Sequence, residues 1–205
     1  MPKTHNRRSH RSIWRRRISR SGCTLVHLAM MVVVVGLIIA WWLNTTTNAA
    51  FFPQTQTYSV PGQPSISADF INRVLDHYHS PAAGKGQALY DYGVKYGIDP
   101  VYALAFFMHE SSFGTTGVAR ITHSLGNIRY TPGYQDYHGY RMYRTWEEGF
   151  EDWYKLISNL YVAQWNLTTV DQIIPVYAPS SDNNDVAAYI QAVKNAVDTW
   201  RTGNV

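Results

Sequence analysis

The sequence predicts a mainly α-helical domain with a small, irregular β-hairpin lobe, preceded by a single transmembrane helix. An uncharged apolar run at residues 25–43 is followed, after a polar stretch, by several segments whose apolar residues recur at helical spacing. Between two of these segments, residues 121–144 are instead rich in glycine and tyrosine, which is typical of short strands joined by turns. These observations together indicate an α+β architecture dominated by helices.

Charge is distributed unevenly along the 205 residues. Residues 1–24 contain eight of the eighteen Lys and Arg residues and no acidic residue. The rest of the chain contains ten basic and fourteen acidic residues, a net charge of −4. The basic character therefore belongs to a tail, which we expect to be cytoplasmic, and the folded part has no charge pattern that favours nucleic-acid binding.

The apolar run at residues 25–43 has the length of a membrane span. A helix of nineteen residues is about 28 Å long, close to the thickness of the hydrocarbon core of a bilayer. Because the basic tail precedes the run, the positive-inside rule predicts a cytoplasmic N-terminus and an extracellular domain, with Trp41-Trp42 at the far interface. A signal peptide cleaved near Thr47-Asn48-Ala49 is the alternative, and it would make the protein secreted.

The remainder of the chain divides into a linker and one domain. Residues 44–66 are polar, contain three prolines and show no periodicity, so we expect an extended linker. Residues 67–205 are numerous enough to bury a hydrophobic core. Cys23 is the single cysteine, which excludes an intrachain disulfide.

Three helices are predicted in the first part of the domain. Ser67 is a suitable N-cap for a helix whose apolar positions lie at residues 70–78. A second helix covers residues 87–96 and is followed by a glycine. Asp99-Pro100 begins the third helix, because proline is favoured at the first helical position, and this helix leads to Glu110.

Three further helices are predicted after the hairpin region. The segment at residues 145–148, Thr-Trp-Glu-Glu, has the pattern of a capping box and begins the first of them. A short helix at residues 169–174 is expected to stop before Pro175. The last helix is expected to begin near Asn184, with Asp182 and Asn183 as further capping groups.

Glu110 is the carboxylate that the sequence favours most as a catalytic group, because it follows an apolar run at residues 104–108. Burial among apolar side chains disfavours the charged form of a carboxyl group and raises its pKa. A carboxylic acid that is protonated near neutral pH can donate its proton to a leaving group. The alternative is an exposed glutamate near the C-terminus of a helix, where the helix dipole disfavours it slightly.

No metal or other cofactor is predicted. Asp76, His77 and His79 lie close together in the sequence, but they lack the further His, Glu or Cys spacing of a metal site. The sequence also has no Gly-rich phosphate loop and no Gly-x-Ser-x-Gly motif.

Four motifs, taken in chain order, resemble those of one enzyme family. They are Ala-Phe-Phe-Met-His-Glu-Ser-Ser-Phe-Gly-Thr at 105–115, Ser-Leu-Gly-Asn at 124–127, Tyr-Arg-Met-Tyr at 140–143 and Tyr-Ala-Pro-Ser-Ser-Asp-Asn-Asn at 177–184. Over residues 67–202 the chain resembles the bacterial glucosaminidases, the mannosyl-glycoprotein endo-β-N-acetylglucosaminidase-like domain of glycoside hydrolase family 73. The resemblance implies a lysozyme-like fold and cleavage of the β-1,4 bonds of N-acetylglucosamine in peptidoglycan.

The resemblance also implies roles for individual residues. Glu110 matches the glutamate of the family's Glu-Ser motif and would protonate the glycosidic oxygen. Tyr177 matches the tyrosine of a Tyr-Ala motif that contacts sugar, although a core tyrosine is the alternative. Ser124 and Asn127 occupy the place of an Asn-Leu-Phe-Gly-type motif, from which this chain departs, and would bind sugar or hold the β lobe.

A second catalytic group is harder to choose from the sequence. Glycosidases generally need a group that activates water or stabilises positive charge at the anomeric carbon. Asp136 lies in the expected β lobe, where relatives often place this group, but an ordinary turn aspartate is the alternative. Glu147 and Glu148 are rivals, and the N-acetyl group of the substrate could act instead.

Three functions are compatible with these residues. The principal prediction is an anchored hydrolase of cell-wall glycan. A lytic transglycosylase also uses one glutamate, but it leaves a 1,6-anhydro product. A catalytically silent wall-binding module would keep the cleft and cleave nothing.

Overall fold

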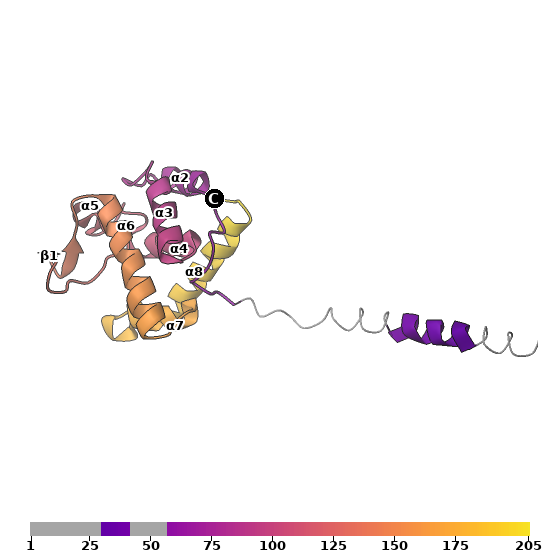
Figure 1. Cartoon of the computed structure of the whole chain (residues 1–205). Coiled ribbons are helices and arrows are strands. Elements are labelled where there is room, and N and C mark those ends of the chain that lie inside the picture. The colour runs from indigo at the N-terminus through magenta and orange to yellow at the C-terminus, as the bar shows by residue number, and fades with distance from the viewer. Residues whose placement is uncertain (1–29, 42–56) are drawn as a thin grey trace, which may run out of the picture. The chain divides into compact units, whose positions relative to one another are not determined.

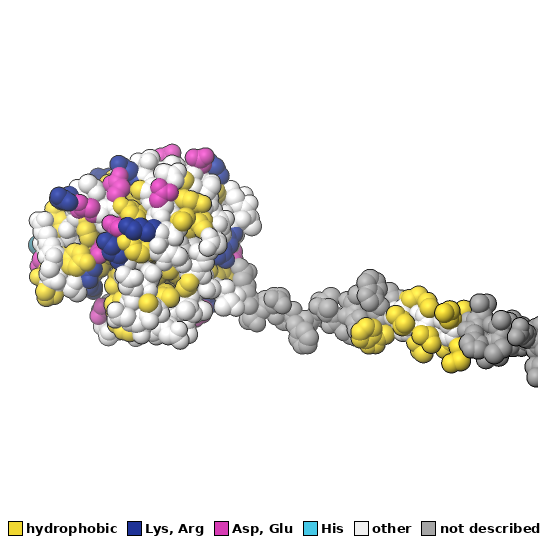
Figure 2. All heavy atoms as spheres, viewed as in Figure 1, with side chains coloured by type: hydrophobic (Ala, Val, Ile, Leu, Met, Phe, Trp, Pro, Cys, Tyr) yellow, Lys and Arg dark blue, Asp and Glu magenta, His cyan; other side chains and the backbone are white. Residues whose placement is uncertain are grey.

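The computed structural model describes residues 30–41 and 57–205. They belong to two compact units, of which the first ends at Thr55 and the second comprises Gln56–Val205. In the first unit, residues 30–41 form a helix whose side chains are all exposed. Figure 2 shows the apolar side chains of this helix, and it also shows acidic and basic side chains interspersed over one face of the second unit.

The helix at residues 30–41 covers only part of the apolar run at 25–43. Its twelve residues extend about 18 Å, which is less than the hydrocarbon core of a bilayer. Among the residues that the structure describes, no helix is both long and apolar enough to cross a membrane. The remainder of the run and the basic tail lie outside the described residues, so the transmembrane helix stays a prediction.

The second unit is mainly helical and contains one small sheet (Figure 1). Its elements in chain order are α2 (Ala68–His77), α3 (Gly86–Tyr96), α4 (Pro100–Ser111), α5 (Ala119–Thr122), β1 (Gln135–Tyr137), β2 (Tyr140–Met142), α6 (Trp146–Lys155), the π-helix η1 (Leu156–Gln164), α7 (Val170–Tyr177), the 3-10 helix η2 (Ser180–Asp182) and α8 (Val186–Arg201). The two strands pair antiparallel, with Asp136 opposite Arg141. The predicted combination of helices with a small hairpin is therefore confirmed.

Three helices, α2, α4 and α6, begin at the capping residues that the sequence indicates. The side chains of Ser67, Asp99 and Thr145 each accept a hydrogen bond from a backbone N–H in the first turn of their helix. The N-cap of α8, however, is Asp185, whose side chain accepts a hydrogen bond from Ala188, and not Asn184. Asp182, which was expected to cap this helix, instead ends η2.

Helix α7 extends further than the sequence predicts, because it continues through Pro175 to Tyr177. A proline inside a helix removes one backbone donor, and the cost of this loss depends on the bonds that remain. The N–H of Ala178 still donates to the carbonyl oxygen of Ile174 at 2.9 Å, so the last turn is closed beyond the proline. This extension places Tyr177 at the end of a helix instead of in a loop.

Helix α4 forms the centre of the domain. Every residue from Pro100 to Phe107 is buried, as expected for a helix that is apolar on all sides. Helix α8 packs along α4, and α3 contacts α2, α4 and α6. In Figure 1, α4 accordingly lies among α3, α6 and α8.

The folded unit begins before residue 67, where the sequence placed its start. Val60 is fully buried, its N–H donates to the carbonyl oxygen of Thr168 at 2.8 Å, and its own carbonyl oxygen accepts from Asp99 at 3.1 Å. The last residues of the expected linker are thus part of the domain. The sequence does not indicate that they belong to the domain, because they pair through isolated bridges, such as that between Pro61 and Ile98, and their apolar residues follow no periodic pattern.

A buried polar cluster fastens the hairpin to α6. Asp152 accepts hydrogen bonds from Nη1 of Arg141 at 2.7 Å and from the hydroxyls of Tyr134 at 2.8 Å and Tyr143 at 2.5 Å. The guanidinium carbon of Arg141 also lies 4.0 Å from the centre of the Tyr134 ring. Because the carboxylate and the guanidinium are both buried, this cluster fixes the position of β2 relative to the helices.

Candidate active site

Helix α4 ends in a tight left-handed turn immediately after Glu110. Ser112 and Phe113 have positive φ values of 46° and 54°, respectively, which side chains other than glycine adopt rarely. The hydroxyl of Ser111 donates to the carbonyl oxygen of Leu125 at 2.8 Å and accepts from the N–H of Gly114 at 2.9 Å. These buried bonds hold the turn in place, and with it the direction of the preceding glutamate.

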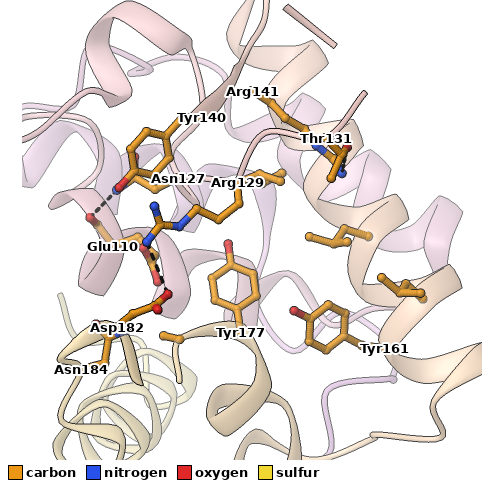
Figure 3. A pocket seen from close by; sticks show the side chains of 14 residues that line it. Glu110, Asn127, Arg129, Thr131, Tyr140, Arg141, Tyr161, Tyr177, Asp182 and Asn184 are labelled. Atoms are coloured by element: carbon orange, nitrogen blue, oxygen red, sulfur yellow. Dashed lines mark hydrogen bonds and ion pairs between the residues drawn. The ribbon is translucent and has the colours of Figure 1, made fainter. Parts of the chain in front are cut away.

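Glu110 lines a cleft of about 400 Å³, which Figure 3 shows from close by. The other lining side chains come from three parts of the chain. The segment that leads into the hairpin, together with β2, contributes polar groups, η1 contributes apolar ones, and the end of α7 with the loop after it closes the third side. Among the residues used below, these are Asn127, Arg129 and Tyr140 on the first side, Leu156, Leu160 and Tyr161 on the second, and Tyr177 and Asp182 on the third.

The carboxyl group of Glu110 is a weaker acid than an ordinary glutamic acid side chain. Burial raises the pKa of Glu110 from 4.5 to about 7, because the charged form loses its hydration. A hydrogen bond from Tyr189, the positive charge of Arg129 and a contact with Asn127 all lower this pKa, but burial outweighs them. The rise that the apolar run predicts is therefore present.

Tyr189 in α8 is the direct partner of this carboxyl group. Its hydroxyl donates to Oε1 of Glu110 at 2.8 Å, and its side chain is almost completely buried. The ring of His109 stacks on the ring of Tyr189 at a centroid distance of 3.6 Å and an angle of 18°. His109 is thus a packing partner, whereas Tyr189 is a site residue that the sequence analysis did not select.

Asn127 and Tyr177 both line the cleft together with Glu110. Nδ2 of Asn127 donates to the backbone carbonyl oxygen of Glu110 at 2.7 Å, and the hydroxyl of Tyr177 donates to the carbonyl oxygen of Gly126. Gly126 leaves no room for a side chain, because a Cβ there would lie 2.5 Å from Trp153. The segment before the hairpin is therefore held between α4, α6 and α7.

Ser124 and Asp136 do not lie among the side chains that line the cleft. Ser124 is buried, and its hydroxyl accepts a hydrogen bond from the N–H of Ile128 at 3.3 Å. Asp136 is exposed on β1, and its carboxylate accepts a hydrogen bond from the N–H of Gly139 at 2.8 Å, which stabilises the hairpin turn. The structure thus gives both residues a role in local conformation.

The rival carboxylates on α6 are also engaged elsewhere. Glu147 forms an ion pair with Lys85 at 2.6 Å, and Glu148 forms one with Arg144 at 2.5 Å. Asp182, which the sequence analysis took for a capping group, lines the cleft together with Glu110. The sequence did not identify Asp182 as a cleft residue, because its position depends on how the loop after α7 folds back.

Arg129 is the second cleft residue that sequence reasoning did not select. Its Nη2 lies 3.4 Å from Oδ2 of Asp182, and its guanidinium carbon lies 5.1 Å from the centre of the Tyr140 ring. Asn127 and Arg129 both line the cleft, but Asn127 has a positive φ of 46°, and the isolated antiparallel bridge to Tyr140 is formed by Arg129. The alternation of a regular strand therefore does not connect the two residues, and no local pattern in the sequence selects Arg129.

Within residues 30–41 and 57–205, no group of three or more His, Cys, Asp or Glu side chains is arranged to hold a metal ion.

Solved structures of autolysin E from S. aureus resemble this chain in fold. One of them, in complex with the muropeptide NAM-L-Ala-D-iGlu, has a TM-score of 0.51 at 11% identity and covers 78% of both chains. Another is a catalytic glutamate-to-alanine mutant in complex with the disaccharide NAG-NAM, with a TM-score of 0.51 at 11% identity, covering 76% of this chain and 77% of that one. No curated protein matches the sequence significantly.

The family whose model matches is described as mannosyl-glycoprotein endo-beta-N-acetylglucosaminidase, and the match extends over residues 86–201. This range contains α3 to α8, and hence Glu110 and the other cleft residues named above. Since it covers more than half of the sequence, the chain belongs to the glucosaminidase family and is a glycoside hydrolase.

Proposed function

We propose that this protein is a membrane-anchored peptidoglycan hydrolase, an endo-β-N-acetylglucosaminidase in which Glu110 is the general acid. The observation that carries the proposal is a carboxyl group with a pKa of about 7 in the cleft of a glucosaminidase-family chain. The muropeptide and the NAG-NAM disaccharide bound to autolysin E support the same class of substrate. A carboxyl group with this pKa is partly protonated at neutral pH, as a general acid must be.

In the first step, Glu110 protonates the oxygen that links the two sugars while the bond from that oxygen to the anomeric carbon breaks. Tyr189 holds Oε1 and so fixes the direction in which Oε2 presents its proton. The rings of Tyr140 and Tyr177 and the apolar side chains of η1 offer surfaces for the faces of the sugars. After bond cleavage, the carboxylate of Glu110 accepts a proton from the attacking water.

The positive charge that develops at the anomeric carbon needs a second group. Asp136 does not line the cleft, and Asp182 lines it with a half-exposed side chain whose contact with Arg129 is long, at 3.4 Å, so this contact does not fix its carboxylate in place. We assign this role to the 2-acetamido group of the substrate, whose carbonyl oxygen bonds to the anomeric carbon as the leaving oxygen departs. Water then attacks the same carbon and releases the acetamido group unchanged.

The decisive experiment digests purified peptidoglycan with the wild-type protein and with Glu110→Gln and identifies the products by mass spectrometry. We expect hydrated N-acetylglucosamine reducing ends from the wild type and none from Glu110→Gln. Glu148→Gln, which changes an exposed glutamate outside the cleft, is the matched control and should digest normally. Circular dichroism verifies that each variant is folded.

Each alternative has its own product. Anhydro ends would identify a lytic transglycosylase, and binding to the wall without cleavage would identify a silent module. Turnover by Glu110→Gln at the wild-type rate would remove Glu110 from the mechanism.

Anchoring rests on the uncharged run at residues 25–43 behind a basic tail. We expect the full chain to sediment with membranes in high salt and to be released by detergent, with its C-terminal domain accessible to protease outside the cell. A shorter protein that begins after residue 43 in the medium would instead show that the run is a cleaved signal.

A further inference from the structure

Two arginines line the cleft, and they differ in how firmly they are held. Arg141 is buried, with Nη1 2.7 Å from Asp152 and Nη2 2.8 Å from Thr131. The side chain of Arg129 is 65% exposed, and its ion pair with the half-exposed Asp182 is long, at 3.4 Å. Arg141 is therefore held in place and supports the structure of the hairpin, whereas the guanidinium of Arg129 can leave Asp182 and bind another carboxylate.

The pair between Arg129 and Asp182 costs little to separate. Exposed ion pairs contribute little to stability, because water solvates the separated charges well. A guanidinium group also presents a planar pair of N–H donors that matches both oxygens of a carboxylate. An incoming carboxylate with good geometry can therefore replace Asp182.

Arg129 lies where such a carboxylate would arrive. Figure 3 shows its guanidinium extending toward Asp182 on the side of the cleft where Glu110 lies, and its positive charge lowers the pKa of Glu110. Glu110 protonates the oxygen on carbon 4 of the leaving sugar, and in N-acetylmuramic acid the neighbouring oxygen, on carbon 3, carries the lactyl group. A cation beside the general acid is thus positioned beside that substituent.

We propose that Arg129 recognises a carboxylate carried by the leaving-group sugar and exchanges Asp182 for it on binding. This inference rests on the proposed function and deepens it, because it makes Arg129 the residue that distinguishes anionic wall glycan from a neutral glycan of the same backbone. The carboxylate has two sources, the free lactyl group of strands stripped of peptide and the acidic residues of an attached stem peptide.

The test compares kcat/KM on four forms of the same glycan. Stripped and peptide-bearing strands are each used as prepared and after conversion of their carboxylates to carboxamides. The measured quantity is the ratio of kcat/KM for the charged form to that for its amide, which cancels general effects on catalysis. Arg129→Gln and Arg129→Lys are compared with Arg144→Gln, an exposed arginine outside the cleft.

For the wild type we expect a ratio of about ten, the size of one charge-assisted hydrogen-bonded contact. In Arg129→Gln the ratio should fall to about one, in Arg129→Lys to an intermediate value, and in Arg144→Gln it should not change. Asp182→Asn should raise the ratio, because it removes the competing carboxylate. If the ratio measured on stripped strands falls in Arg129→Gln, the carboxylate is the lactyl group. If the ratio falls only on peptide-bearing strands, the carboxylate belongs to the stem peptide.

A ratio in Arg129→Gln within twofold of that of the wild type would overturn the inference, and so would a wild-type ratio near one. Calorimetric titration with N-acetylmuramic acid and with its carboxamide separates this result from failure of the proposed function. If the wild type cleaves no strand but prefers the acid in an Arg129-dependent manner, the proposed function fails and the inference stands. If it binds both equally well, the inference fails as well.

Discussion

The hydroxyl of Tyr189 donates a hydrogen bond of 2.8 Å to Oε1 of Glu110, which lies 79 positions earlier in the chain. The bond connects α8 to the end of α4, two helices that pack against each other along the centre of the domain. Because a hydrogen bond to the carboxylate form favours ionisation, Tyr189 moderates the rise in the pKa of Glu110 that burial causes. Position and acidity of the candidate acid thus depend on the same contact.

The wild-type enzyme should lose activity as the pH rises through about 7. The sign follows from the role of Glu110, since a general acid works only while it is protonated and its pKa is raised to about 7. The measurement is kcat/KM on soluble glycan between pH 4 and pH 9. A profile that stays flat to pH 9 would exclude Glu110 as the acid.

Replacement of Tyr189 by phenylalanine should move this alkaline limb to higher pH. The substitution removes the hydrogen bond that stabilises the carboxylate form, so the carboxyl group of Glu110 keeps its proton longer. Tyr92→Phe, in which the changed ring lies on α3 and does not line the cleft, is the control. A downward shift in Tyr189→Phe would contradict this account of the carboxyl group.

Glu110→Gln should stabilise the fold, and more so at high pH. The pKa of Glu110 is higher in the folded state, about 7, than its ordinary value of 4.5, so the folded state holds the proton more tightly. The stabilisation of the folded state by this bound proton is fully present below pH 4.5 and is lost as the pH rises through 7. Since one pKa unit corresponds to about 1.4 kcal/mol, the variant should gain up to about 3 kcal/mol over the wild type at pH 8.

Urea unfolding at pH 8 and at pH 4 measures this gain. The two proteins should differ clearly at pH 8 and much less at pH 4. Equal differences at both values would mean that the effect of the substitution is unrelated to charge.

Asp152→Asn should destabilise the domain by about 3 kcal/mol, because it leaves the buried cation of Arg141 without its counter-ion. Loosening of the hairpin should also lower kcat/KM, since Arg141 and Tyr140 both line the cleft. Thermal unfolding and activity are measured together. Glu148→Gln breaks an exposed ion pair on the same helix and should change the midpoint of unfolding little.

Asp136→Asn should keep activity within about twofold of the wild type, a change typical of surface substitutions. The side-chain oxygen of asparagine can still accept the hydrogen bond from Gly139, and the residue does not line the cleft. Initial rates on peptidoglycan provide the measurement. A loss of a hundredfold or more would restore Asp136 as the second catalytic group and argue against participation of the acetamido group.

Much of the local structure follows from the sequence. Caps at Ser67, Asp99 and Thr145 predict the starts of their helices, because a cap satisfies backbone donors within its own turn. The limits appear where interactions are not local. Val60 joins the domain by bonding to Thr168 and Asp99, and no pattern within its own segment reveals this.

The candidate site divides in the same way. The sequence by itself determined α4 and its apolar character, and it predicted the direction of the pKa shift of Glu110, since this carboxyl group follows an apolar run. Only the tertiary structure decided which groups surround this carboxyl group: Tyr189 donates a hydrogen bond to it, Arg129 and Asp182 line the same cleft, and Asp136 does not line it. The reason is that a desolvated helix is encoded by adjacent residues, whereas a hydrogen-bond partner or an ion pair depends on how distant segments pack.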